Sequence, residues 1–157
     1  MKKVMLMALV LLLGLPTFAQ GKKTEKIPQN VKEAFTKAYP NVKEVKWDVE
    51  GEEYEASFKL KGTDVSVVID NDGEIEETET EIAVSELPSN IIPYITKNFK
   101  GYKVTAAAKI VKEDNDVTYE AEITKYKTHK DLIFNQDGII VKKHKEKKEK
   151  PDKEEND

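Results

Sequence analysis

The chain has 157 residues, a formal charge of −4, 36% charged side chains and no cysteine. The missing cysteine excludes disulfides, thiol catalysis and thiolate metal sites. All 26 basic side chains are lysines. The forked arginine donor that reads guanine edges and grips phosphates in pairs is therefore absent, and we expect no nucleic-acid partner.

The first residues predict an export signal. Met1-Lys2-Lys3 gives a charged start, Val4 to Leu15 carries no charge, and a small residue, Ala19, precedes the expected cleavage point. An apolar run this short cannot cross about 30 Å of hydrocarbon, so we expect no membrane span once residues 1–19 are removed. We expect the mature protein to be periplasmic or secreted, with residues 20–26 as a linker.

The rest of the chain contains one unit twice. The stretch "IPQNVKEAFTKAY" (27–39) aligns with "LPSNIIPYITKNF" (87–99) at a separation of 60 residues, and "YEASF" and "VIDNDGEI" align with "YEAEI" and "IFNQDGII" at a separation of 65. The pattern indicates a tandem duplication. The predicted repeats are residues 27–82 and 87–141.

Each repeat begins with an amphipathic helix. Apolar residues recur at helical spacing from Ile27 to Tyr39, and Pro40 ends the run. In the second repeat we expect the helix to begin near Ser89 or Asn90. This start places Pro93 in the first turn, where its missing N–H leaves no hydrogen bond unmade.

The remainder of each repeat alternates between apolar and polar residues with period two, which predicts half-buried strands. Short turns separate the strands, so neighbours must be antiparallel. The fold class we predict is α+β: a tandem repeat of one helix plus a four-stranded antiparallel meander, as one eight-stranded sheet with both helices on one face. The expected strands are 45–49, 54–60, 65–69 and from 75 on, then 104–110, 117–123, 132–134 and 139–141.

The last sixteen residues, 142–157, mix both charges and contain no apolar residue after Val141. Such a segment cannot bury enough surface to offset its ordering entropy, so we predict a disordered tail. Docking of this tail to an anionic lipid or polymer is the alternative, and it is weakened by Glu146 and Glu149.

The stretch "VIDNDGEIEE" (68–77) invites comparison with a calcium loop. Aligned on Gly73, the loop lacks its first ligand because Val68 stands there. The second repeat keeps only the Asp-Gly pair, as Asp137-Gly138. We therefore predict a hairpin turn in which both turn residues adopt positive φ. A divalent cation or small ligand held by Asp70, Asp72 and Glu74 remains the alternative.

The sequence shows no signature of an enzyme. Glu77 and Glu79 share one strand face with few apolar neighbours, so we expect them to be solvated and not an acid/base pair. His129 and His144 have no metal-ligand spacing and no third ligand. No G-x-S-x-G or glycine-rich phosphate motif occurs, so we expect no catalysis, no metal and no cofactor.

One set of positions carries a family resemblance: Pro28, Val31, Phe35, Tyr39-Pro40, Val45, Trp47, Tyr54, Ala56, Phe58 and Asp72-Gly73, with their second-repeat equivalents. With the signal peptide and the duplication, this pattern resembles the β-lactamase-inhibitor-like, PepSY-like proteins exported by Bacteroidetes-type bacteria, over Ile27 to about Val141. The resemblance implies a helix-plus-four-strand repeat and a periplasmic, non-catalytic role. Related modules restrain peptidases, and the namesake inhibitor clamps an enzyme across its sheet.

We therefore expect an exported non-catalytic protein-binding module, an inhibitor or regulator of a periplasmic hydrolase or peptidase whose identity the sequence does not give. The outward strand face is charged and lacks the aromatic and arginine side chains typical of binding hot spots. The residues expected to contact a partner are Glu55, Lys59, Tyr102, Glu120, Glu122 and Tyr126.

Overall fold

The computed structural model describes residues 26–143 and 147–148. They form two compact units: residues up to Thr80 with Val111–Asn115, and Glu81–Ile110 with the residues from Asp116 on. The predicted signal at 1–19, residues 20–25 of the predicted linker, and residues 144–146 and 149–157 of the predicted tail lie outside the described part. Within that part, no helix is both long and apolar enough to cross a membrane.

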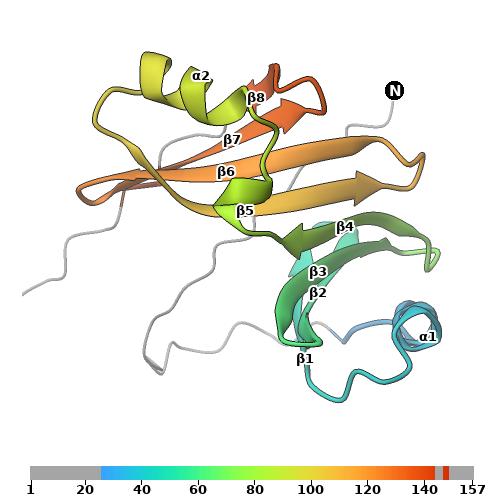
Figure 1. Cartoon of the computed structure of the whole chain (residues 1–157). Helices are drawn as coiled ribbons and strands as arrows, with labels where there is room; N and C mark the ends of the chain where they lie inside the picture. Colours follow the sequence, from blue (N-terminus) through green and yellow to red (C-terminus); the bar gives the residue numbers. More distant parts are fainter. Residues whose placement is uncertain (1–25, 144–146, 149–157) are drawn as a thin grey trace, which may run out of the picture. The chain divides into compact units, whose positions relative to one another are not determined.

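The order of elements is a helix followed by four strands, twice (Figure 1). The first set is α1 (Gln29–Ala38), β1 (Val45–Glu50), β2 (Glu53–Leu60), β3 (Thr63–Asp70) and β4 (Ile75–Glu81). The second set follows a short 3₁₀ helix, η1 (Val84–Glu86), and comprises α2 (Ile91–Asn98), β5 (Lys103–Lys112), β6 (Val117–Lys125), β7 (Thr128–Asn135) and β8 (Ile140–Lys143). Strand β9 (Lys147–Lys148) pairs with β7. The strands pair in chain order, β1 to β8, so the predicted α+β fold with one eight-stranded antiparallel sheet is confirmed.

The two helices begin one or two residues after their predicted starts, and α1 ends before Pro40 as predicted. In α1 the buried residues are Val31 and Phe35, one turn apart, and the Tyr39 N–H donates to the Phe35 carbonyl at 2.8 Å before Pro40 stops the helix. In α2 the equivalent buried residues are Ile91 and Ile95. Pro93 is the third residue of α2 and lies in its first turn, as predicted.

Helix α1 packs on one face of the first unit's strands. The strand register sets Ala56 opposite Val67 and Phe58 opposite Val65, so alternate residues of β2 and β3 meet the helix. The Phe35 ring lies 5.4 Å from that of Trp47 and 5.2 Å from that of Phe58. Trp47 therefore packs against the core. The buried members of this core are Val31, Phe35, Ala56, Phe58, Val65, Val67 and Ile69.

Helix α2 has a core of its own in the second unit. The Tyr94 ring meets the fully buried Phe134 ring edge-on at 5.6 Å. Ala121 pairs with Leu132 across β6 and β7, and both face the helix. The buried members are Leu87, Ile91, Ile95, Ala107, Ala121, Ile123, Leu132 and Phe134.

The two Asp-Gly turns differ from the prediction in their backbone. Gly73 and Gly138 have φ of 86° and 68°, but neither Asp72 nor Asp137 has positive φ. The Asp70 carboxylate accepts the N–H groups of Asp72 at 2.9 Å and Glu74 at 2.8 Å, and the pairing register shifts between Val68 and Ile69. The expectation of two positive-φ residues was wrong, because a side-chain-capped turn followed by a left-handed glycine at a bulge needs only one.

These turns also hold the helices. Asn30 at the start of α1 donates its side-chain N–H to the Asn71 carbonyl, and Asn90 before α2 donates to the Asp137 carbonyl. A Cβ on Gly73 would come within 3.2 Å of the Asn30 carbonyl oxygen, and one on Gly138 would overlap the Asn90 side chain. The asparagine and glycine that both repeats share are therefore partners across one contact.

Candidate functional site

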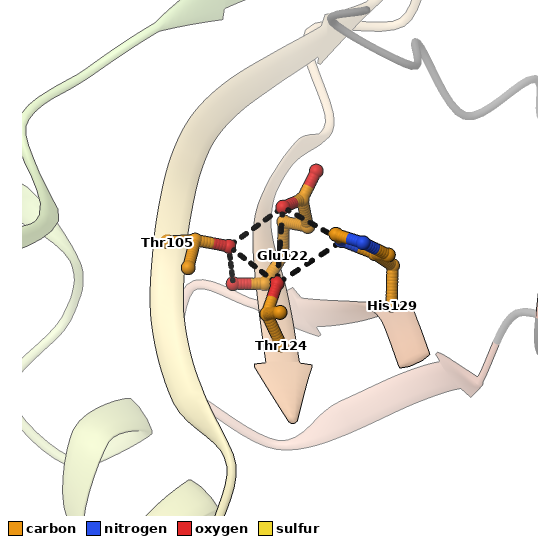
Figure 2. A network of polar contacts seen from close by, with 4 residues as sticks. All are labelled: Thr105, Glu122, Thr124 and His129. Carbon is orange, nitrogen blue, oxygen red and sulfur yellow. Dashed lines mark hydrogen bonds and ion pairs between the residues drawn. The ribbon is translucent and has the colours of Figure 1, made fainter. Parts of the chain in front are cut away.

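The candidate site lies on strands β5, β6 and β7 of the second unit, on the face turned away from α2. Alternation along β6 sends Ala121 and Ile123 into the core and Glu122 and Thr124 to the other side. The β6–β7 turn then places His129 directly opposite Thr124. Figure 2 shows these side chains with Thr105 of β5 as one polar network.

The network is linked by short contacts. Thr105 Oγ1 donates to Glu122 Oε1 at 2.6 Å and lies 3.0 Å from Thr124 Oγ1. Thr124 Oγ1 lies 3.1 Å from His129 Nδ1, and that nitrogen lies 3.6 Å from Glu122 Oε1. The side chains of His129 and Glu122 remain 41% and 24% exposed. The four side chains thus hold one another in place while solvent and partners can still reach them.

The residue types suggest a hydroxyl–imidazole–carboxylate triad, but the geometry does not support one. In such a triad the carboxylate and the hydroxyl approach different nitrogens of the ring. Here Glu122 Oε1 and Thr124 Oγ1 both approach Nδ1. Glu122 therefore cannot orient the ring while the ring takes a proton from Thr124, and the arrangement is suited to holding a surface and not to activating a nucleophile.

The first unit has an ion pair at the equivalent strand positions. Sixty-five residues before Thr124 and His129 stand Lys59 and Asp64, and Lys59 Nζ donates to both Asp64 carboxylate oxygens at 2.8 Å. The pair lies beside an open groove next to β1, lined by Asn41, Val42, Lys43, Glu44, Val45, Lys46, Ser57, Phe58, Lys59 and Asp64. Exposed pairs of this kind contribute at most about 1 kcal/mol. The groove is open and carries both charges, so it does not resemble the enclosed apolar pocket of an enzyme.

The carboxylates expected on the outward strand face differ in exposure. Glu55 and Glu120 are buried, at 8% and 5% exposed, whereas Glu122 is half-buried. Glu77 and Glu79 are also buried, so the expectation that they are solvated was wrong. Alternation assigns a side chain to one face of a strand, but it does not tell what covers that face.

The two tyrosines expected to contact a partner have different environments. Tyr102 is half-buried and packs against the second core, with its ring 6.3 Å from that of Phe99. The ammonium groups of Lys125 and Lys130 lie 5.8 Å and 5.6 Å from its ring centre. Tyr126, at the β6–β7 turn, is 92% exposed and has φ of 53°.

The acidic turn of the first unit uses its carboxylate internally. Asp70 Oδ1 accepts hydrogen bonds from two backbone N–H groups, whereas the residues Asp72 and Glu74 are exposed. Across the ranges that the structure describes, no group of three or more histidine, aspartate or glutamate side chains could hold a metal ion.

The sequence predicted Glu122 on the outward strand face but did not join it to Thr105, Thr124 and His129. The pairing of Thr124 with His129 could have been found by closing the turn at Tyr126-Lys127 and counting outward. The pairing with Thr105 depends on how β5 aligns with β6, for which the sequence has no comparable signal.

No protein-family model matches the chain, and no curated protein matches it. Several solved structures share its fold. A DUF2874 family protein from Bacteroides uniformis ATCC 8492 has a TM-score of 0.67 and 20% identity over 76% of this chain and 89% of that one. A protein from Bacteroides eggerthii DSM 20697, provisionally described as periplasmic, has a TM-score of 0.67 and 19% identity over 76% of this chain and 88% of that one.

The third structure is a BLIP-like protein from Bacteroides fragilis NCTC 9343, with a TM-score of 0.60 and 22% identity over 82% of this chain and 94% of that one. These likenesses cover 76% to 82% of this chain. The resemblance drawn from the sequence is confirmed at the level of the fold: this chain folds like the DUF2874 family and BLIP-like proteins of Bacteroides.

Proposed function

We propose that the protein is an exported, non-catalytic protein-binding module that inhibits or regulates a periplasmic hydrolase or peptidase. The observation that carries the proposal is the network of Thr105, Glu122, Thr124 and His129 on an accessible sheet face. The likeness to a BLIP-like protein and to one provisionally described as periplasmic supports it.

A pre-formed polar network suits protein recognition. Each side chain that is already fixed before a partner arrives loses less conformational entropy on binding. Glu122 Oε1 accepts a hydrogen bond from Thr105 and leaves the second carboxylate oxygen, Oε2, for a lysine, arginine or amide of a partner. Because both Glu122 and Thr124 approach the same ring nitrogen of His129, the network supports binding better than catalysis.

The proposal is tested by affinity purification of the tagged, cross-linked protein from the periplasm of its own bacterium. Glu122→Lys reverses the charge of the network, and Glu33→Lys makes the same change on the exposed side of α1 as a matched control. We expect the wild type and Glu33→Lys to capture the same hydrolase or peptidase, and Glu122→Lys to lose it. The purified wild type should then lower that enzyme's activity.

Two outcomes contradict the proposal. One is a partner that Glu122→Lys retains as well as the control does, which would separate binding from the network. The other is the absence of any reproducible partner in cross-linked samples, which would remove the protein-binding function itself.

A further inference from the structure

The β6–β7 turn carries the exposed Tyr126 between Lys125 and Lys127, at one end of the second unit. The β6–β7 turn and the loop from α2 to β5 meet there (Figure 1), because Lys125 Nζ donates to the Lys100 carbonyl at 3.2 Å. The Lys125 side chain also lies over Gly101, 3.1 Å from where a Cβ would stand. We call this the lysine–tyrosine end; it comprises Lys100, Lys103, Lys125, Tyr126, Lys127 and Lys130.

The first repeat shows that the fold does not require most of these side chains, since only Lys103 has the same residue at its equivalent position, Lys43. At the equivalent positions Pro40 stands for Lys100, Leu60 for Lys125, Lys61 for Tyr126, Gly62 for Lys127 and Val65 for Lys130. The backbone is nevertheless alike: Lys61 and Tyr126 both have φ of 53°. The second repeat therefore carries extra positive charge and an aromatic ring on the same turn.

Tyr126 gives little to the stability of its own unit. Its side chain is 92% exposed, so it buries almost no apolar surface. Its left-handed backbone is uncommon for a bulky residue, and asparagine or glycine would fit the turn better. A residue that is both exposed and strained suggests a role outside the unit's own packing.

The two units also carry opposite charge. Among the described residues, the first unit has sixteen acidic and eight basic side chains, a formal charge of −8. The second unit has seven acidic and eleven basic side chains, a formal charge of +4. An acidic first unit and a lysine-rich end on the second are complementary.

The exposed carboxylates of the first unit are concentrated at one end. The β1–β2 and β3–β4 turns lie at the same end of the antiparallel strands, where Glu53 pairs with Asp70. The Glu113 N–H donates to the Glu76 carbonyl at 2.9 Å and brings a third turn there. The exposed members of this acidic end are Glu52, Asp72, Glu74 and Glu113.

We propose that the lysine–tyrosine end of one copy docks on the acidic first unit of a second copy. The contact joins two different surfaces, so a bound pair still offers one free surface of each kind, and assembly continues unless a ring closes. Tyr126 supplies the apolar contact at the centre of a charged rim. The surface differs from the Thr105–His129 network, so the proposal stands apart from the function proposed above.

An anionic membrane fits this end less well. The whole chain has a formal charge of −4, which such a surface repels. Interfacial binding also needs a broad apolar face. Of the large exposed apolar side chains in the described residues, only Tyr126 lies at this end; the others are Leu60, Ile92, Ile139 and Val141.

The test is sedimentation velocity of the purified protein over a range of concentrations, at about 50 mM and about 500 mM salt, since screening weakens contacts between exposed charges. The basic-end variant is Tyr126→Asn with Lys127→Glu, and the acidic-end variant is Asp72→Lys with Glu74→Lys. Lys61→Glu changes the same turn in the first unit and serves as the control.

We expect reversible association of the wild type that weakens at high salt, and a rise of at least about tenfold in the dissociation constant for each double variant. The control and Glu122→Lys should associate like the wild type. Mixing the two double variants should restore a complex that stops at one copy of each, since only one complementary pair of surfaces remains.

The proposal is overturned if the wild type stays monomeric at low salt, or if the mixture of double variants forms no dimer. It is also overturned if the double variants lose thermal stability without losing association, because the two ends would then interact within one chain. Binding of a monomeric wild type to phosphatidylglycerol vesicles, lost in the basic-end variant, would assign the end to a membrane instead. Loss of self-association leaves the test of the hydrolase partner unaffected.

Discussion

The two repeats carry different side chains on equivalent strand positions. Lys59 and Asp64 form a two-bond ion pair in the first unit, whereas Thr124 and His129 join Glu122 and Thr105 in a hydrogen-bonded network in the second. The contact between the helix start and the Asp-Gly turn is present in both. The contact that both repeats keep is one that the fold needs. The polar network, which only the second unit has, is a property of that unit's surface.

The cores differ as well, while filling the same space between helix and strands. The first core has Phe35 and Phe58 where the second has Ile95 and Ile123. The second instead has Tyr94 and Phe134 where the first has Ala34 and Ile69. Aromatic rings occupy different layers of two similar cores, which is possible because close packing depends on summed volume more than on any one residue.

The largest effect should follow from emptying the first core. Phe35→Ala removes a ring that meets those of Tyr39, Trp47 and Phe58, and we expect a loss of about 3–5 kcal/mol in unfolding free energy. Thr36→Ala, on the exposed side of α1, should cost less than about 0.5 kcal/mol. Urea denaturation measures both. Hydrogen exchange should show the loss concentrated in α1 and β1–β4, and equal losses in both units would show that they unfold as one.

A smaller effect is expected where glycine meets the helix. Gly73→Ala should cost about 1–3 kcal/mol, because the left-handed backbone and the nearby Asn30 carbonyl both oppose a Cβ. Gly138→Ala should cost at least as much, since the Asn90 amide would have to leave the Asp137 carbonyl to make room for the Cβ. Gly51 has φ of 67°, and a Cβ added there would meet no atom within 4 Å. Gly51→Ala therefore measures the cost of the left-handed backbone alone. Equal thermal shifts for all three would mean that the helix contact adds nothing.

The Asp70 carboxylate should contribute about as much to stability as the neutral Asn135 amide does in the other repeat. Asn135 Oδ1 accepts the Ile139 N–H at 2.8 Å, as Asp70 Oδ1 accepts that of Glu74. We therefore expect Asp70→Asn to be nearly neutral and Asp70→Ala to cost about 1–2 kcal/mol. Calcium should leave the melting temperature of the wild type unchanged. A calcium-dependent rise that Asp70→Asn abolishes would restore the cation-binding alternative, because a ligand specific for the folded state must stabilise it.

The smallest effect is a gain. Tyr126→Asn should raise the unfolding free energy by a few tenths to about 1 kcal/mol, because asparagine tolerates the left-handed region and the exposed ring packs on little. Lys61→Asn should give a similar gain at the equivalent turn. Differential scanning calorimetry resolves shifts of this size. A loss of stability in Tyr126→Asn would show that the ring supports its own unit after all.

Periodicity and duplication were sufficient to predict the architecture. The 3.6-residue spacing of Val31 and Phe35, the stop at Pro40 and the place of Pro93 all follow from local sterics and burial, and the structure agrees. Two expectations drawn from local patterns failed. The Asp-Gly turns contain a bulge because the Asp70 side chain caps the first and the Asn135 side chain caps the second, and Glu77 and Glu79 are buried on a face that alternation alone would leave in water.

The candidate site illustrates the same limit. Glu122 was predicted as a contact residue from its strand face. Its carboxylate is held by a hydrogen bond from Thr105, which lies seventeen residues earlier on another strand. The expected contact residues Glu55 and Glu120 belong to the same alternation and are nevertheless buried. Register between strands and the layer above them are set by tertiary packing, for which a single sequence carries no direct signal.

The contact between helix start and hairpin turn also bears on the order of folding. Asn30 and Asn71 are 41 residues apart, and Asn90 and Asp137 are 47 apart, so each bond closes almost a whole repeat into one loop. Hairpins between neighbouring strands close far shorter loops and gain contacts sooner. Each helix should therefore dock after its strands have paired. Stopped-flow measurements of Asn30→Ala should show faster unfolding with an unchanged folding rate, so that this bond governs how long the folded repeat lasts and not how quickly it forms.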